Sequence, residues 1–465
     1  MKGYYTMTNE ELQMKRKPVL ETKDDAYLST IFAYGEDYKA FLDASKTERE
    51  AVKTAVAMAK DNGYTEYRLG DVIRKGGKYY FNNRGKNLFL FRIGTAPLDE
   101  VGLRILAAHI DSPRIDIKQN PLYEDSGMCF LKTHYYGGIK KYQWPTLPLA
   151  LHGVVVLRDG TVKEVRIGED ENDPVFYIND LLPHLAQDQS AKPLGSAISG
   201  ESLNIFVGGI PYMAEEGDDR IKMNILHILN EKYGMTEADF LSAELSAVPA
   251  FKARDVGFDR LFIGAYGHDD RVCAYPELTA LFASEDTVNS SLVILADKEE
   301  TGSDGNTGMS ADIMLDLIDE ISRAFGASPA RVRAASKCLS ADVTAAYDPN
   351  FAEVYEKKNS SFVSCGTAVC KFTGARGKSS TNDASAEFMG FIRRVFDNAG
   401  VAWQTCELGK VDQGGGGTVA KFISKHNIDT IDVGVPVISM HAPYEMISKV
   451  DIYETHRALL AFIEA

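Results

Sequence analysis

The chain lacks the features that would suit it to nucleic acid or to a membrane. Its 465 residues include 51 lysines and arginines against 66 aspartates and glutamates, which gives a formal net charge of -15. An acidic chain without a basic stripe does not neutralise phosphates, so nucleic acid and anionic membranes are not expected partners. No segment has the roughly 18 to 20 uninterrupted apolar residues of a transmembrane helix, and residues 1–6 lack the apolar core of a signal peptide. We therefore expect a cytoplasmic protein with a small substrate.

Cysteine is also scarce. The chain has six cysteines, and no two of them form a Cys-X-X-Cys pair. Their spacing resembles neither a structural zinc site nor a disulfide framework. A catalytic cysteine needs an electropositive setting that lowers its pKa, and the sequence indicates none. We expect most of them to be small buried apolar residues: Cys129, Cys273, Cys338, Cys365, Cys370 and Cys406.

Two kinds of sequence pattern divide the chain. Apolar runs typical of strands and amphipathic segments typical of helices alternate in residues 1–120 and again in residues 250–465. Between residues 121 and 249, aromatic and β-branched runs alternate with turns such as Arg158-Asp159-Gly160. The first pattern predicts an α/β fold with a mostly parallel sheet flanked by helices. The second pattern predicts a β-rich domain, residues 121–249, which is inserted into a catalytic domain of residues 1–120 plus 250–465.

Five motifs that carry acidic residues or histidine each follow a strand-like run. Ligands of a parallel sheet gather beyond the carboxyl ends of its strands, so these motifs are expected to meet there. Imidazole and carboxylate groups suit zinc, cobalt or manganese with a position left open for water. The motifs contain His109 and Asp111, Asp269 and Asp270, Glu299 and Glu300, Asp342, and His441.

Each motif alone has a simpler explanation. A satisfied core histidine would explain His109, a helix cap would explain Asp269, and a solvated acidic turn would explain Glu299-Glu300. Independent caps and turns have no reason to form one ordered set, which favours a metal centre. Asp111 lies two residues after His109 on extended chain and is better placed to orient its ring than to share its metal. Adjacent side chains point opposite ways, so one of Glu299 and Glu300 can bind metal while the other faces the water.

The motifs resemble those of the aspartyl aminopeptidase family, the aminopeptidase I-like peptidases with two zinc ions. The likeness covers nearly the whole chain and includes Tyr136-Gly137-Gly138 and residues 182–186 of the inserted region. It implies a metal-dependent aminopeptidase that removes the N-terminal residue of a peptide, with a preference for acidic residues. It also implies two divalent ions per subunit, zinc with cobalt or manganese as alternatives.

The resemblance assigns roles residue by residue. One metal would be held by His109, Asp269 and Asp342, and the other by Asp269, Glu300 and His441. Asp269 would bridge the two ions, and Glu299 would be the general base that activates the shared water.

Two further assignments come from the same resemblance. Lys371 would pair with an acidic side chain of the substrate, although a plain surface lysine is an equal alternative. His184 would reach from the inserted domain into the active site of a neighbouring subunit. The family implies a homo-oligomer, a dodecamer built from dimers, with the inserted domain at the subunit contacts.

The sequence also departs from the family pattern and leaves other functions open. Ala345 and Asp348 stand where better-known members have histidines, and Arg376-Gly377-Lys378 replaces their Arg-Tyr pair. A neutral or basic first residue of the substrate therefore stays possible. The same ligand set would serve a carboxypeptidase or a deacylase, and an assembly protein without catalysis is a third alternative.

Overall fold

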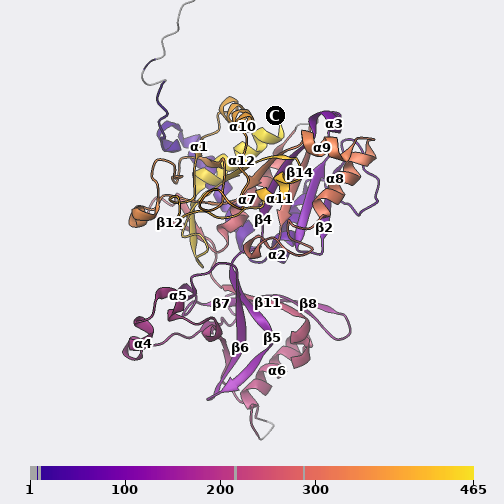
Figure 1. The fold of residues 1–465 in the computed structure, drawn as a ribbon. Helices are drawn as coiled ribbons and strands as arrows, with labels where there is room; N and C mark the ends of the chain where they lie inside the picture. Colours follow the sequence, from indigo (N-terminus) through magenta and orange to yellow (C-terminus); the bar gives the residue numbers. More distant parts are fainter. Residues whose placement is uncertain (1–7, 9–11, 214–216, 286–287) are drawn as a thin grey trace, which may run out of the picture.

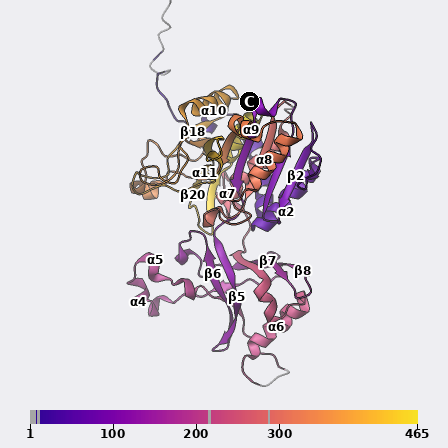
Figure 2. The same cartoon turned by 45° about the vertical axis from the view of Figure 1, so that its right-hand side comes forward.

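The molecule consists of an upper body of helices and strands and a lower body built around one sheet (Figures 1 and 2). This computed structural model describes residues 8, 12–213, 217–285 and 288–465. The chain enters the lower body after residue 113 and returns after residue 249, so the lower body is a continuous stretch of sequence. In the described ranges, no helix is long and apolar enough to cross a membrane.

A nine-stranded sheet forms the centre of the upper body. Its four central strands β14, β4, β15 and β19 run parallel, and β3 and β17 pair with them in the antiparallel sense. The sheet is therefore mixed around a parallel centre. In spatial order its strands are β1 (Thr65–Glu66), β2 (Lys78–Asn83), β3 (Asn87–Arg92), β14 (Ser290–Ala296), β4 (Leu103–His109), β15 (Lys337–Ala341), β19 (Asp429–Gly434), β17 (Thr367–Cys370) and β18 (Trp403–Thr405).

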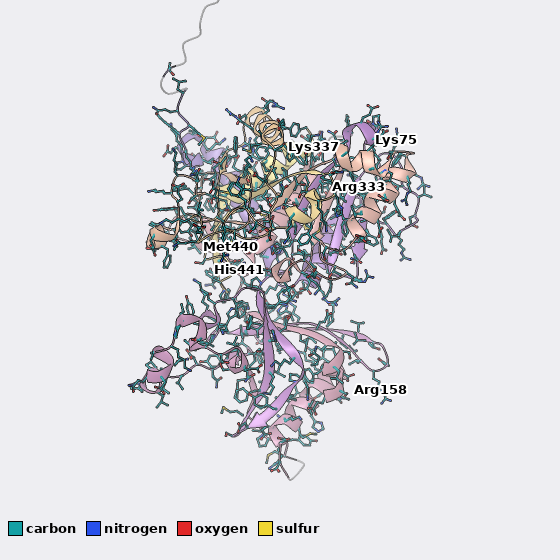
Figure 3. All side chains as sticks on the ribbon, viewed as in Figure 1. Lys75, Arg158, Arg333, Lys337, Met440 and His441 are labelled. Atoms are coloured by element: carbon teal, nitrogen blue, oxygen red, sulfur yellow. A yellow bond between two sulfur atoms is a disulfide. The ribbon has the colours of Figure 1, made fainter. Side chains whose placement is uncertain are left out.

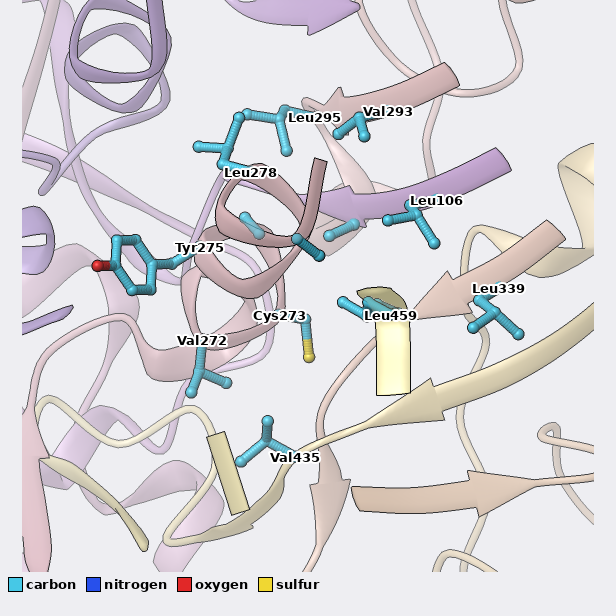
Figure 4. Packing of buried hydrophobic residues seen from close by; sticks show 14 of the residues in the cluster. Leu106, Val272, Cys273, Tyr275, Leu278, Val293, Leu295, Leu339, Val435 and Leu459 are labelled. Carbon is cyan, nitrogen blue, oxygen red and sulfur yellow. The ribbon is translucent and has the colours of Figure 1, made fainter. Parts of the chain in front are cut away.

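Helices cover both faces of this sheet because every central strand is buried on both sides. Along β4, Leu106 belongs to one apolar cluster while Ile105 and Ala107 belong to the other, as the alternation of a strand requires. Figure 4 shows the first cluster, where Leu106 and Leu295 lie toward α7 (His268–Ala283) and Leu339 continues the cluster along the sheet. This face carries α1 (Asp25–Asp43), α2 (Glu48–Asp61), α7 (His268–Ala283), α10 (Ala386–Asn398) and α12 (Lys449–Ile463). The other carries α3 (Leu98–Val101), α8 (Ile313–Ala324), α9 (Pro329–Ala335) and α11 (Ala420–Ser424).

A second, five-stranded sheet lies beside the first. Residues 430–440 form one mostly apolar run in the sequence, but the chain leaves the large sheet at Gly434 and enters the small one at Pro436. An apolar run has the same composition on both sides of such a crossing, which is why the sequence hides it. The small sheet contains β12 (Arg254–Val256), β13 (Phe262–Ala265), β21 (Glu445–Ser448), β20 (Pro436–Ile438) and β16 (Thr344–Ala345).

The lower body is a seven-stranded antiparallel sheet. The predicted hairpin around Asp159 is present, since β7 and β8 pair in register on either side of it. Helix α6 (Arg220–Tyr233) packs on this sheet through Ile221 and Ile225. The strands are β8 (Val162–Ile167), β7 (Leu149–Val156), β11 (Ala243–Pro249), β5 (Arg114–Asp125), β6 (Met128–Tyr136), β10 (Ile205–Gly208) and β9 (Tyr177–Ile178). Short helices η3 (Pro183–Leu185), α4 (Gln187–Ser190) and α5 (Leu194–Ala197) flank it.

Buried charges join the two bodies beside α2. His152 of β7 lies 2.8 Å from Glu50 through Nδ1 and 2.9 Å from Glu169 through Nε2. Lys46 donates to Glu169 at 2.6 Å and to the carbonyl of Pro249 at 2.8 Å. These ion pairs, rather than apolar packing alone, hold the inserted sheet against the upper body.

Candidate metal centre

His109 ends β4 and presents one ring nitrogen to the site. Its Nδ1 donates to the carbonyl oxygen of Asp111 at 3.0 Å, so a neutral ring carries no proton on Nε2. The Asp111 carboxylate accepts the amide protons of Glu299 at 3.1 Å and Glu300 at 3.2 Å, and the Tyr136 hydroxyl at 2.7 Å. These hydrogen bonds fix Asp111 behind the histidine ring, as expected of a residue that orients the ring.

Asp269 lies between the two histidines. One carboxylate oxygen, Oδ1, is 3.1 Å from Nε2 of His109, and the other, Oδ2, is 3.2 Å from Nε2 of His441. Nδ1 of His441 donates to the carbonyl of Gly138 at 2.8 Å, so this ring also directs a free nitrogen at Asp269. The structure thus brings together residues that are up to 332 positions apart in the chain, since His109 and His441 meet at Asp269. A carboxylate with one oxygen toward each imidazole has the geometry of a bridging ligand.

Asp269 and His441 do not extend from the large sheet, which corrects the expectation that all five motifs end strands of one sheet. Asp269 follows β13 and His441 follows β20, both in the five-stranded sheet. Figure 3 places His441 at the edge of the upper body that faces the inserted sheet. His109, Glu299 and Asp342 do follow β4, β14 and β15 of the large sheet. The site therefore lies where the two sheets meet.

Glu299 and Glu300 occupy a short 3-10 turn, η6 (Glu299–Thr301), after β14. Oε1 of Glu300 is 3.5 Å from Nε2 of His441, while Oε2 of Glu299 is 4.0 Å from Nε2 of His109. Burial raises the pKa of both carboxyl groups, and the negative charge of Asp269 adds to the effect. Both side chains thus reach the cluster from one turn, and the division into one metal ligand and one residue that faces the water stays a prediction.

Asp342 and Asp270 complete the acidic cluster. Oδ1 of Asp342 is 4.0 Å from Nε2 of His109, directly after β15. Asp270 accepts the amide proton of His109 at 3.3 Å. Burial and the charge of Asp270 raise the pKa of Asp342 well above its ordinary value. Within the described residues, two groups of close ligand atoms share His109: one adds Asp270 and Asp342, and the other adds Asp269 and Glu300.

The cluster fits divalent cations. Among the described residues, Oδ1 of Asp269, Oδ1 of Asp270 and Oε1 of Glu300 are buried without a hydrogen-bond partner, although imidazole nitrogens lie near two of them. Buried polar atoms are otherwise satisfied in folded proteins. Burial lowers the pKa of His441, but the nearby Asp269 and Glu300 raise it to about 10. The cluster thus attracts positive charge, and a bound cation would replace that proton.

Glu445 and Tyr136 are functional neighbours that the sequence analysis did not assign. The two oxygens of Glu445 accept the amide protons of His441 at 2.8 Å and Asp269 at 3.1 Å, which ties the two residues together. A carboxylate four residues after His441 was the available signal.

His268 is structural, since its ring nitrogens contact the Tyr38 hydroxyl and the Ile263 carbonyl.

A cavity of about 990 Å³ opens from the cluster. His109, Asp269 and Glu299 line it at the metal centre, and two loops within residues 370–378 and 407–418 line another part of its wall. Lys371 is not among the lining residues; its ammonium group lies 2.5 Å from Asp383. Four cationic side chains line the wall instead: Arg376, Lys378, Lys410 and Lys421.

His184 does not line the cavity of this centre. It lies exposed in η3 beside α4, in the lower body. The predicted approach to a neighbouring subunit stays a prediction.

One cysteine pair departs from the sequence analysis. Cys370 and Cys406 form a disulfide, while Cys129, Cys273, Cys338 and Cys365 are free and buried as expected. Cys370 ends β17, and Cys406 follows its neighbour β18. Strand pairing brings them together across 36 residues, which spacing alone does not show.

Comparison with known proteins identifies the family. A model described as aminopeptidase I zinc metalloprotease (M18) matches residues 41–463. The probable M18 family aminopeptidase 1 of Clostridium acetobutylicum is 48% identical over 461 residues, which cover 97% of this chain and 99% of that protein. The chain belongs to the M18 family. It is a metallo-aminopeptidase, as the motifs predicted.

Solved M18 structures share the fold. The M18 aminopeptidase of Thermotoga maritima has a TM-score of 0.92 at 44% identity and covers 97% of this chain and 100% of its own. The mApe1 dodecamer of S. cerevisiae has a TM-score of 0.75 at 20% identity and covers 92% of this chain and 96% of its own, which shows the fold alone. The predicted α/β fold is confirmed.

Proposed function

We propose that this M18 aminopeptidase works with two divalent cations held on either side of Asp269. The observation that carries the proposal is the pair of contacts from the Asp269 oxygens to His109 and His441, at 3.1 and 3.2 Å. Asp342 joins His109 on one side, and Glu300 joins His441 on the other. Zinc suits these donors, and cobalt or manganese accepts them as well.

Asp270 competes with Asp269 for the role of ligand. Asp270 belongs to one of the two close groups around His109, but one of its oxygens already accepts the His109 amide. Nδ1 of His109 is used by Asp111, so its single free nitrogen can serve only one ion. Asp269 reaches both histidines, which favours it as the bridge.

The protein residues divide the chemistry of peptide hydrolysis. When bound, the cations supply Lewis acidity that makes a water nucleophilic and polarises the scissile carbonyl. Glu299 takes a proton from the attacking water and returns it to the leaving amine. Its raised pKa suits this transfer. The acidic cluster attracts the free α-amine of the substrate, which directs cleavage to the N-terminal residue.

We further propose a preference for acidic N-terminal residues. Beyond the metal centre the cavity is lined by Arg376, Lys378, Lys410 and Lys421, while Glu407 is the acidic residue among the lining residues of the same segments. A carboxylate in this part of the cavity meets an excess of positive charge. Lys378 contacts Asp383 at 3.0 Å, so it has a partner that a substrate carboxylate would replace.

Assembly into a dodecamer built from dimers is proposed on two grounds. The M18 structure from S. cerevisiae is a dodecamer. The segment around His184 exposes Leu181, Leu182, Leu185 and Leu194, each at least 46% accessible. Apolar residues gathered in this way mark a contact surface. We assign this surface to the inserted domain, which the sequence predicts as residues 121–249 and whose sheet begins at residue 114. We also propose that the chain is cytoplasmic.

The test is a panel of aminoacyl reporter substrates with free and with acetylated N-termini. The purified protein is assayed after chelation and again after zinc, cobalt or manganese is restored. We expect no hydrolysis in chelator, recovery with metal, cleavage of free N-termini only, and the highest kcat/KM for Asp or Glu. Cleavage of acetylated or C-terminal substrates would instead indicate a deacylase or a carboxypeptidase on the same scaffold.

A further inference from the structure

The turn of residues 136–138, at the end of β6, enters the metal centre from the inserted sheet. The Tyr136 hydroxyl donates to Oδ2 of Asp111 at 2.7 Å. The Gly138 carbonyl accepts the Nδ1 proton of His441 at 2.8 Å. One turn of three residues therefore contacts groups behind both histidines.

On the His109 side, Tyr136 holds the side chain of Asp111, the residue whose backbone contacts the histidine ring. Tyr136 donates to the Asp111 side chain, and the Asp111 carbonyl accepts from Nδ1 of His109. Burial and the charge of Asp111 raise the pKa of the Tyr136 hydroxyl, which keeps it a donor. The guanidinium of Arg114 lies 4.1 Å from the centre of the Tyr136 ring, and Arg114 is itself held by Glu48 at 3.0 Å. The phenol thus has a fixed position.

The two glycines bring the turn against the remaining ligands. Gly137 has a φ of +74°, and a Cβ on it would lie 3.3 Å from Oε2 of Glu300. A Cβ on Gly138 would lie 3.2 Å from Nδ1 of His441. A side chain at either position would push Glu300 or His441 by a few tenths of an ångström, and the positive φ of Gly137 also favours glycine there.

We propose that the turn of residues 136–138 is a positioning element through which the inserted sheet sets the orientation of both metal-binding histidines. The inference rests on the proposed two-cation centre. Groups that hold the second nitrogen of a ligating histidine typically change metal affinity or activity by about 10- to 100-fold when they are removed. In this enzyme such groups come from a separate sheet, so the upper body alone does not complete its own metal centre.

Tyr136→Phe tests the proposal, because it removes one hydroxyl and keeps the ring. Zinc affinity, measured by competition with a chromogenic chelator, should weaken by about 10-fold or more. The visible spectrum of the cobalt-loaded protein should change, and activity lost at limiting zinc should return in excess zinc. Tyr135→Phe is the matched control, since Tyr135 is 41% exposed on the same strand, and it should behave as the parent does.

Gly138→Ala supplies an independent variant on the His441 side and should weaken zinc binding in the same direction. Thermal unfolding of the metal-free proteins should be unchanged in Tyr136→Phe, which separates positioning from general destabilisation. A zinc affinity and a cobalt spectrum equal to those of the parent in both variants would overturn the proposal. Since zinc binding is measured without substrate, an absence of aminopeptidase activity would count against the proposed function and leave this readout intact.

Discussion

The two ends of the active-site cavity are built in different ways. At the metal end, His109 is 1% exposed and each histidine ring is held by a second bond on its far nitrogen. At the opposite wall, Lys378 is 44% exposed and extends from a loop rather than from a strand. The contrast teaches that the reaction depends on buried strand ends, while substrate selectivity depends on loops that can vary without disturbing it.

The largest effect should come from Glu299→Gln at the metal end. The amide cannot accept a proton from water, so kcat should fall by about 10²- to 10⁴-fold while zinc content and KM change little. Metal analysis and steady-state kinetics measure both. Activity within tenfold of the parent would remove Glu299 from the role of base, and total inactivity of the parent itself would favour an assembly protein.

The next largest effect concerns zinc affinity and distinguishes two adjacent carboxylates. Asp269→Asn should weaken zinc binding by more than about 100-fold, because loss of a direct ligand exceeds the effect of an outer group. Asp270→Asn keeps an oxygen that accepts the His109 amide and should change zinc affinity by less than about tenfold. Equilibrium dialysis against a zinc buffer gives both values. The opposite ranking would make Asp270 the ligand.

At the cation-lined wall, smaller effects are expected. Lys378→Ala should lower the kcat/KM ratio of acidic over neutral N-terminal residues by about twofold to fivefold, the range of a partly exposed ion pair. Lys371→Ala is the matched control, because Lys371 also contacts Asp383 but does not line the cavity. A larger loss in Lys371→Ala would support its predicted role in substrate binding.

The smallest effect on activity should follow changes at the junction between the two bodies. Burial lowers the pKa of His152, but hydrogen bonds to Glu169 and Glu50 raise it above the ordinary value overall. Stabilisation from its positive charge is therefore complete below about pH 6.5, the pKa of an unfolded histidine, and is lost as pH rises through the raised value. Denaturant unfolding should show that the free energy of unfolding falls as pH rises through this range. His152→Gln should make the free energy of unfolding depend less on pH. An unchanged slope in the variant would exclude His152 as its source.

The sequence predicted the metal end better than the opposite wall. Acidic and histidine motifs after apolar runs indicated His109, Asp269 and His441 because strand ends must deliver side chains to a common edge. The sequence could not show that β13 and β20 belong to a second sheet, since both sheets use the same apolar residues. The pairing of Cys370 with Cys406 and the bond from Asp269 to Glu445 join distant segments, for which one sequence has no signal. The position of Glu445 four residues after His441 was a signal for its other bond, to the His441 amide. Which side chains line the wall depends on loop conformation, which the sequence does not show. The resemblance therefore indicated Lys371, whereas Lys378 lines the cavity.

Anomalous diffraction at the zinc edge, from crystals grown with zinc, tests the central claim most directly. The account predicts two peaks about 3.5 to 4 Å apart, one on each side of the Asp269 carboxylate. His109 and Asp342 should contact one peak, and Glu300 and His441 the other. A single peak, or two peaks that Asp269 does not join, would contradict it.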